Sequence, residues 1–256
     1  MRTLRLIRDD HPEPPALDTA IARATLEGVA SGALPETLRV HRPAAVLAFG
    51  PRDRVAAGFP EALAAAGAHG FAAVERLAGG RAAVFHPGTV AFSWALPLGS
   101  PREGIRSRFE ETAELVAGAL GALGVDARIG EVPGEYCPGE HSVNAGGRTK
   151  LAGVGQRIVA GAAHVGGVVV VAGSDRVREV LVPVYRALGL DWRPETTGSV
   201  EDEVPGVTWA AVADALVARF AERFLVQELP ATPARVVTRA GGLVAAHALD
   251  PGEKNE

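Results

Sequence analysis

The residue in this sequence best suited to covalent chemistry is its single cysteine, Cys137. It lies in a stretch rich in Gly and Pro, Gly134-Glu-Tyr-Cys-Pro-Gly139, which predicts an exposed loop, whereas an inert free cysteine is usually buried. A thiol is largely protonated below about pH 8.5 unless a nearby positive charge stabilises the thiolate. Lys150 follows the hairpin signal Gly146-Gly147, which predicts a strand pair that returns its ammonium group to the Cys137 loop. The pair therefore indicates nucleophilic catalysis, with the lysine stabilising the thiolate and polarising an acyl carbonyl. The alternative is an idle loop cysteine and a surface lysine.

Lysine is scarce in this chain. Of 26 lysine and arginine residues, only Lys150 and Lys254 are lysine, and Lys254 lies in the charged tail 251–256. Lysine is a compact point charge with an adjustable pKa, whereas arginine is a broad fork that stays charged. A lysine retained at Lys150 therefore indicates chemistry that a guanidinium group does not supply, and the alternative is chance.

A second candidate is the segment from Arg76 to Gly88, which connects two predicted strands. Its paired glycines, Gly79 and Gly80, let the backbone approach a ligand closely and turn N–H groups toward an anion or a carbonyl oxygen. Arg76 and Arg81 supply positive charge at the two ends of this glycine pair. In a chain with 31 glycines, an ordinary tight turn is the alternative interpretation.

Histidines offer a competing scheme. His141 lies four residues after Cys137 and is a candidate base, and His86 and His164 are further options. Because catalytic partners meet in space rather than in sequence, this proximity is weak support, and we expect His141 to be a loop residue and His164 a satisfied histidine at a strand start. The spacing of the cysteine and histidines predicts no metal site.

The elements that must position these residues are groups of short strands separated by long helices. This order predicts an α+β fold, a mixed β-sheet packed with helices, rather than regular βαβ alternation. The predicted helices are Leu17–Val29, Pro60–Ala68, Arg106–Leu123, Asp175–Leu188 and Trp209–Leu225. The predicted strands are Thr37–Val40, Ala45–Phe49, Ala72–Leu77, Ala82–Phe85, Thr89–Leu96, Ser142–Asn144, Thr149–Val154 and His164–Val171.

Composition excludes several classes of protein. The net charge of −4 argues against nucleic-acid or membrane-surface binding driven by bulk charge. No apolar run approaches the roughly 20 residues needed to span a bilayer, and charges interrupt the N-terminal apolar stretch, so no secretory signal is expected. One cysteine fits a reducing compartment, which predicts a cytoplasmic protein.

Together the two motifs resemble the lipoate- and biotin-protein ligase superfamily, and most closely its octanoyl- or lipoyl-amidotransferases that use the glycine cleavage H protein. The resemblance covers roughly residues 17–225. The matching positions are Arg76, Gly79, Gly80, His86 and Gly88 in the first motif, and Cys137, Lys150, Gly153, Gln156 and Arg157 in the second. Arg81 stands where the ATP-using ligases tend to carry a third glycine, so the Gly-Gly-Arg sequence is closer to the transferases. Ala78 departs from the usual Ser or Thr, which removes one hydroxyl contact.

The resemblance implies the superfamily's catalytic domain, here residues 17–228, with a tunnel for an eight-carbon acyl chain. Residues 229–256 would then be a short tail, because about thirty residues are too few for the ligases' accessory domain. It also implies Cys137 and Lys150 as catalytic residues. The substrate-binding residues that it implies are Arg76, Gly79, Gly80, Arg81, His86, Gly88, Gly153 and Gln156.

The implied reaction moves an octanoyl or lipoyl group through a Cys137 thioester to a lysine of a lipoyl domain in a 2-oxoacid dehydrogenase complex. The implied donor is the H protein or an acyl carrier protein, with no cofactor, no nucleic acid and no membrane. One alternative is an ATP-dependent lipoate-protein ligase that forms lipoyl-adenylate, and only that reaction would need ATP and Mg. A second alternative is a binding module without catalysis that sequesters lipoyl domains or a small acyl compound.

Overall fold

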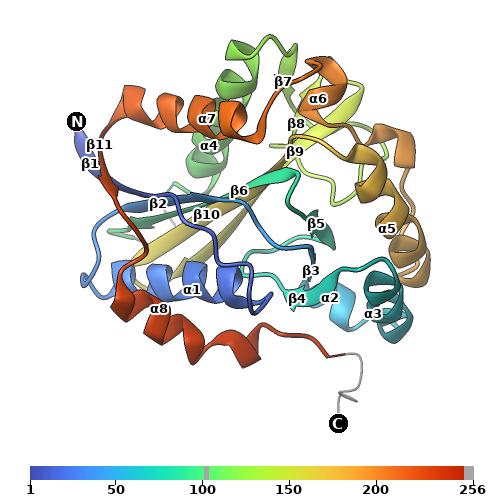
Figure 1. Cartoon of the computed structure of the whole chain (residues 1–256), viewed down its shortest axis with the longest axis horizontal. Coiled ribbons are helices and arrows are strands. Elements are labelled where there is room, and N and C mark those ends of the chain that lie inside the picture. Colours follow the sequence, from blue (N-terminus) through green and yellow to red (C-terminus); the bar gives the residue numbers. More distant parts are fainter. Residues whose placement is uncertain (101–103, 251–256) are drawn as a thin grey trace.

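Most strands join one mixed sheet (Figure 1), in the order β11-β1-β2-β6-β10-β9-β8-β7. The computed structural model describes residues 1–100 and 104–250. The strands of this sheet are β1 (Arg2–Ile7), β2 (Thr37–His41), β6 (Thr89–Pro97), β7 (Ala127–Ile129), β8 (Val143–Ala145), β9 (Thr149–Val159), β10 (Ala162–Val170) and β11 (Phe224–Leu229). Strand β1 pairs in parallel with β2 and β11, and the other pairs are antiparallel. The α+β prediction, a mixed sheet packed with helices, is confirmed.

Helices cover both faces of this sheet, because its strands are apolar on both sides. On β6 the even-numbered residues from Val90 to Leu96 belong to a core with α4 and α7, whereas Ala95 packs against α1 on the other face. Helix α8 packs along α1 (Figure 1). The helices are α1 (Leu17–Ala30), α2 (Pro51–Arg54), α3 (Phe59–Ala68), α4 (Ile105–Ala122), α5 (Ser174–Ala187), α6 (Val200–Glu203), α7 (Trp209–Arg223) and α8 (Ala234–Gly241), with 3₁₀ turns η1 (Pro194–Thr196) and η2 (Val244–Ala246).

A smaller sheet lies beside the α1 face and carries the Gly-Gly segment. Its order is β4-β3-β5, from β3 (Val46–Phe49), β4 (Ala72–Glu75) and β5 (Ala83–Phe85). It shares a second apolar core with α3 and α5, including the buried Tyr185. The loop between β4 and β5 is thereby held between the two sheets.

Small residues cross the middle of the large sheet. Gly166 of β10 lies opposite Ser93 of β6 on one side and Gly155 of β9 on the other. A Cβ at Gly155 would lie 3.0 Å from the Cβ of Ala78, so the Gly-Gly loop packs directly on this row. The small residues of this row therefore let the loop lie close against the sheet.

The packed structure extends beyond the range 17–228 that the resemblance suggests. Strand β1 precedes that range and joins the large sheet, and helix α8 lies within 229–256, the range expected to be a tail. The predicted helix Trp209–Leu225 ends at Arg223, because Phe224 and the residues after it extend to pair with β1. Lys254, with the rest of 251–256, lies outside the described residues.

No helix in residues 1–100 and 104–250 is both long enough and apolar enough to cross a membrane.

Candidate active site

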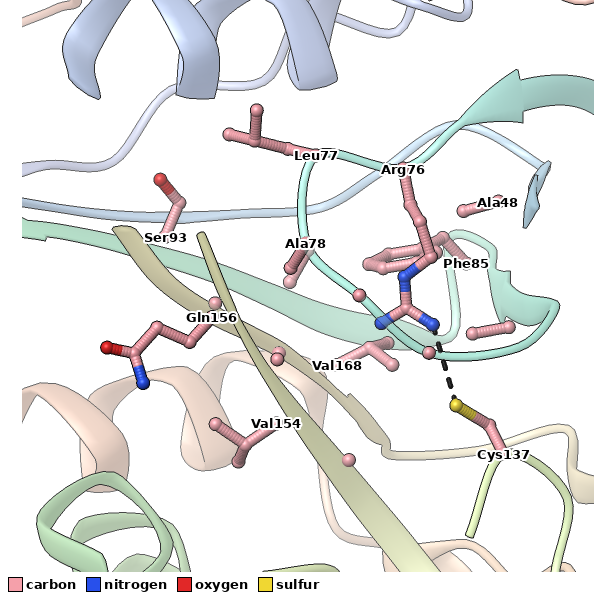
Figure 2. Close-up of a pocket in the computed structure, with 18 of the residues that line it drawn as sticks. Ala48, Arg76, Leu77, Ala78, Phe85, Ser93, Cys137, Val154, Gln156 and Val168 are labelled. Atoms are coloured by element: carbon pink, nitrogen blue, oxygen red, sulfur yellow. Dashed lines mark hydrogen bonds between the residues drawn. The ribbon is translucent and has the colours of Figure 1, made fainter. Parts of the chain in front are cut away.

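A cavity of about 610 Å³ lies between the large sheet, the small sheet and the loops that carry the two motifs. Figure 2 shows part of its lining: Ala48 and Phe85 from the small sheet, Ala78 from the Gly-Gly loop, and Val154 and Val168 from the large sheet. Cys137 lies at one side of this space. Such a cavity, largely apolar with a few polar groups, is typical of a site for an organic ligand.

The backbone of Cys137 is in an unusual conformation. Its φ of +42° lies in the left-handed region, which residues other than glycine rarely adopt. Its N–H donates a hydrogen bond of 2.9 Å to the hydroxyl of Tyr185, which in turn donates one of 3.0 Å to the carbonyl of Ala82. Burial raises the pKa of Tyr185 well above its ordinary value, so this hydroxyl stays protonated. Helix α5 thus fixes the Cys137 loop, residues 134–139, to the small sheet.

The Cys137 sulfur faces the Gly-Gly loop and accepts two hydrogen bonds from it. The backbone N–H of Arg81 lies 3.2 Å from Sγ, and Nη1 of Arg76 lies 3.5 Å from it. Both donors carry full or partial positive charge, and both distances suit sulfur, which is larger than oxygen. The sulfur is thus held against the Gly-Gly loop by one backbone donor and one side-chain donor.

Lys150 lies beside Cys137, but it contacts the backbone of the loop. Its side chain is almost completely buried. Its ammonium group donates to Glu135 Oε1 at 2.9 Å, to the Tyr136 carbonyl at 3.0 Å and to the Cys137 carbonyl at 2.8 Å. The structure therefore brings the two predicted catalytic residues together, with all three ammonium protons used away from the sulfur.

Glu135 is a site residue that sequence reasoning missed. Its carboxylate is fully buried and accepts four hydrogen bonds, from the backbone N–H groups of Val132 and Gly139, the hydroxyl of Ser142 and the ammonium of Lys150. A buried carboxylate needs such partners. Its position two residues before Cys137 was the available signal. Tyr185 was also missed, and nothing in the sequence near it pointed to the site.

The Gly-Gly loop is closely packed at Gly80 and open at Gly79. Gly80 has φ +119°, and a Cβ there would lie 2.6 Å from Arg76 Nη1 and 2.9 Å from Cys137 Sγ. A Cβ at Gly79 would meet nothing within 4 Å. The side chain of Arg81 leaves the cavity to pair with the buried Asp53 at 3.2 Å. The loop thus offers the sulfur its backbone N–H and keeps the guanidinium of Arg81 elsewhere.

The other predicted binding residues divide into two groups. Gly153 and Gln156 line the cavity, where the Gln156 side chain is held by Arg108 at 2.5 Å and by the carbonyl of Ile105 at 3.1 Å. His86 and Gly88 form a turn that is not part of the cavity lining: the Gly88 N–H donates to His86 Nδ1 at 3.0 Å. Arg157, also in the second motif, pairs across the strands with His164.

The three histidines proposed as alternative bases have different surroundings. His141 lines the cavity and stacks on Phe109, with the ring centroids 5.3 Å apart. His164 lines it too, whereas His86 is buried in its turn, and burial lowers the pKa of each to about 4. No hydrogen bond joins any of the three to the Cys137 sulfur within the described chain. Nor do His, Cys, Asp or Glu side chains gather in metal-binding groups of three or more in residues 1–100 and 104–250.

Comparisons with known proteins agree with this architecture. The family model described as the lipoyl protein ligase A/B catalytic domain matches residues 14–221. An octanoyl-[GcvH]:protein N-octanoyltransferase from Geobacillus kaustophilus is 30% identical over 240 residues, which cover 94% of this chain and 81% of the relative. The enzyme of the same name from Exiguobacterium sibiricum is 36% identical over 151 residues, 58% of this chain and 53% of that one.

Two solved structures share the fold. Lipoate-protein ligase A bound with ATP superposes with a TM-score of 0.76 at 21% identity, covering 96% of this chain and 95% of the other. The bi-partite lipoate protein ligase from Thermoplasma acidophilum gives a TM-score of 0.72 at 22% identity, with 96% and 92% covered.

Gly80→Ala should destabilise the protein by about 1–3 kcal/mol, because φ +119° is unfavourable for alanine and the new Cβ would displace Arg76 or Cys137. Gly79→Ala is the matched control, since open space surrounds that position. Urea unfolding of both variants measures the difference, and equal stabilities would show that the Gly80 contact does not constrain the loop.

Glu135→Gln should lower the free energy of unfolding by about 3–5 kcal/mol, because it leaves the buried Lys150 ammonium without its countercharge. The control is Glu110→Gln in the exposed pair with Arg106, where the loss should stay below about 1 kcal/mol. Denaturant titration at neutral pH compares the two, and a similar small loss in both would contradict a structural role for the buried pair.

Protonation of His164 should destabilise the fold as the pH falls. Its folded-state pKa of about 4 lies below the value near 6.5 of the unfolded chain, so its contribution is full above about pH 6.5 and lost as the pH falls toward 4. Between about pH 7.5 and about pH 5, wild type should therefore lose more stability than His164→Gln. His69→Gln, at an exposed position, should behave like wild type. Equal losses of stability in wild type and His164→Gln over this pH range would contradict the lowered pKa of His164.

Proposed function

The chain belongs to the lipoyl protein ligase A/B catalytic domain family, and we propose that within it the protein is an octanoyltransferase that carries the acyl group on Cys137. The donor is the glycine cleavage H protein, and the acceptor is a lysine of a lipoyl domain. The names of the two curated relatives support this choice of donor.

One observation carries the proposal: a lone cysteine in a strained loop turns its sulfur toward a guanidinium and a backbone N–H at the side of an apolar cavity. A structural cysteine needs neither the positive surroundings nor the cavity. An adenylate-forming ligase has no use for a thiolate at this place. The arrangement suits an enzyme that forms a thioester.

The reaction proceeds in two acyl transfers. The Cys137 thiolate attacks the carbonyl of the octanoyl-lysine amide on the donor, the C–N bond breaks, and the lysine amine leaves after taking up a proton. The lysine amine of the acceptor then attacks the thioester carbonyl, loses a proton, and releases the Cys137 thiolate. One amide is consumed and one is formed, so the exchange needs no ATP and no cofactor. The covalent intermediate divides one difficult exchange into two easier steps.

The cavity supplies most of the affinity for the acyl group. Its lining includes aliphatic and aromatic side chains from both sheets. Burial of an eight-carbon chain at about 0.8 kcal/mol per methylene contributes several kcal/mol to binding. This binding energy holds the acyl carbonyl at the Cys137 sulfur while the donor protein leaves and the acceptor protein binds.

The proposed partners follow from this chemistry. An acyl carrier protein would present a thioester, from which acyl transfer is easy, whereas an acylated H protein presents an amide, for which an activated thiolate matters most. The acceptors are lipoyl domains of 2-oxoacid dehydrogenase complexes. A free catalytic thiol works best in a reducing compartment, so we assign the protein to the cytoplasm.

Incubation with octanoyl-H protein should add the mass of one octanoyl group to the chain, and Cys137→Ser should abolish both this thioester and the transfer to a lipoyl domain. Intact-mass spectrometry detects the adduct, and hydroxylamine should remove it from wild type. Octanoyl-carrier protein, run in parallel, identifies the preferred donor. Transfer by Cys137→Ser at the wild-type rate would sink the proposal. If the protein instead releases pyrophosphate from ATP only when free lipoate is present, it is a lipoate ligase and not a transferase.

A further inference from the structure

Two cations approach the nucleophile, and they contact different parts of it. The guanidinium of Arg76 points at the Cys137 sulfur (Figure 2), with Nη1 at 3.5 Å from Sγ. The ammonium of Lys150 instead donates to the Cys137 carbonyl at 2.8 Å. Only the first of these contacts involves the atom that reacts.

The charge of Lys150 is already balanced. Its ammonium forms a buried ion pair of 2.9 Å with Glu135, and its remaining two protons go to the carbonyls of Tyr136 and Cys137. A buried pair of this kind is close to neutral from outside, so it adds little positive potential at a neighbouring sulfur. Its geometric effect is large, because it fixes two consecutive carbonyls of the loop.

The charge of Arg76 is not balanced by a carboxylate. Within the described chain it donates to the Arg81 carbonyl, at 2.6 Å from Nη1, and to the Cys137 sulfur. The side chain is half-buried, so its attraction to a sulfur at 3.5 Å is screened less than at the surface. A thiolate is the anion that this site offers the guanidinium.

We propose that Arg76 is the residue that holds Cys137 as a thiolate, and that Lys150 is a positioning residue that fixes the loop backbone. The inference deepens the proposed function, on which the catalytic meaning of the thiolate rests. On ionisation the thiol proton passes to water, and the S⁻ formed pairs with the guanidinium and the Arg81 N–H. Attack on the acyl carbonyl then moves this negative charge from sulfur to the carbonyl oxygen.

Two glycines keep the guanidinium in place. A Cβ at Gly80 would lie 2.6 Å from Arg76 Nη1, and one at Gly155 would lie 3.3 Å from Nη2. Side chains at these positions would compete for the space that Arg76 occupies. Gly80 of the Gly-Gly loop and Gly155 of the large sheet therefore leave a slot for this arginine.

The test is the rate of alkylation of Cys137 by iodoacetamide as a function of pH, which reports this thiol alone because the chain has one cysteine. Arg76→Gln should raise the midpoint pH of alkylation by about one unit or more, as expected for loss of a cation near an ionising group. Arg106→Gln removes an exposed charge at the same cavity and should leave the midpoint close to wild type. The double variant Glu135→Gln/Lys150→Met removes the buried pair together, which preserves folding better than removing one partner, and should shift the midpoint less than Arg76→Gln.

An Arg76→Gln midpoint equal to that of wild type, or a larger shift in the double variant, overturns the inference. The comparison of Arg76→Gln with Arg106→Gln tests the role of Arg76 even if the double variant does not fold. The assay needs no acyl donor, so its result is separate from that of the adduct experiment. A normal octanoyl adduct with an unshifted Arg76→Gln midpoint would leave the proposed function standing and remove only the role of Arg76.

Discussion

The buried ion pair between Lys150 and Glu135 is the interaction on which the geometry of the site depends. Burying two charges is costly unless every lone pair and proton finds a partner, and here each partner lies in the Cys137 loop or next to it. The carboxylate accepts hydrogen bonds from backbone N–H groups, while the ammonium donates hydrogen bonds to backbone carbonyls. The resulting network compensates for the strain of a cysteine at φ +42°. The pair thereby adds to the contacts from Tyr185 and from the Arg81 N–H that hold Cys137 in this conformation.

Each of the two sheets contributes a different part of the site. The large sheet provides a row of small residues, where Gly166 lies between Ser93 and Gly155. The small sheet provides the Gly-Gly loop, which packs on this row. Tyr185 links the Cys137 loop to the small sheet, because its hydroxyl bonds both the Cys137 N–H and the Ala82 carbonyl. The cavity is lined from both layers, so it depends on the packing of the two sheets rather than on one loop.

Sequence reasoning found the parts of the site whose chemistry is unusual for this composition. Cys137 was visible as the lone cysteine in a loop, and Lys150 as a lysine in a chain of arginines, and the mixed sheet followed from the order of long helices and short strands. Glu135 was missed because a carboxylate gains meaning only when the loop folds around a buried ammonium. Strand β1 was missed because its charges interrupt the apolar pattern and its partner β11 comes from the other end of the chain. Pairing between such distant segments leaves no local signal.

The different cations at the site suit the different geometries of their acceptors. Lys150 faces a carboxylate oxygen and two carbonyls, and a compact ammonium with three rotatable donors can satisfy these together, whereas a planar guanidinium cannot. Arg76 must reach the Arg81 carbonyl and a large sulfur while remaining charged in a half-buried slot, which suits a planar fork that does not lose its proton. This difference gives a physical reason for retaining lysine at Lys150 in a chain whose other Lys and Arg positions, except Lys254, are all arginine. The proposed division of roles follows from the same difference. Lys150, which contacts the loop backbone, is paired with Glu135, whereas Arg76, which contacts the sulfur, has no carboxylate partner in the described chain.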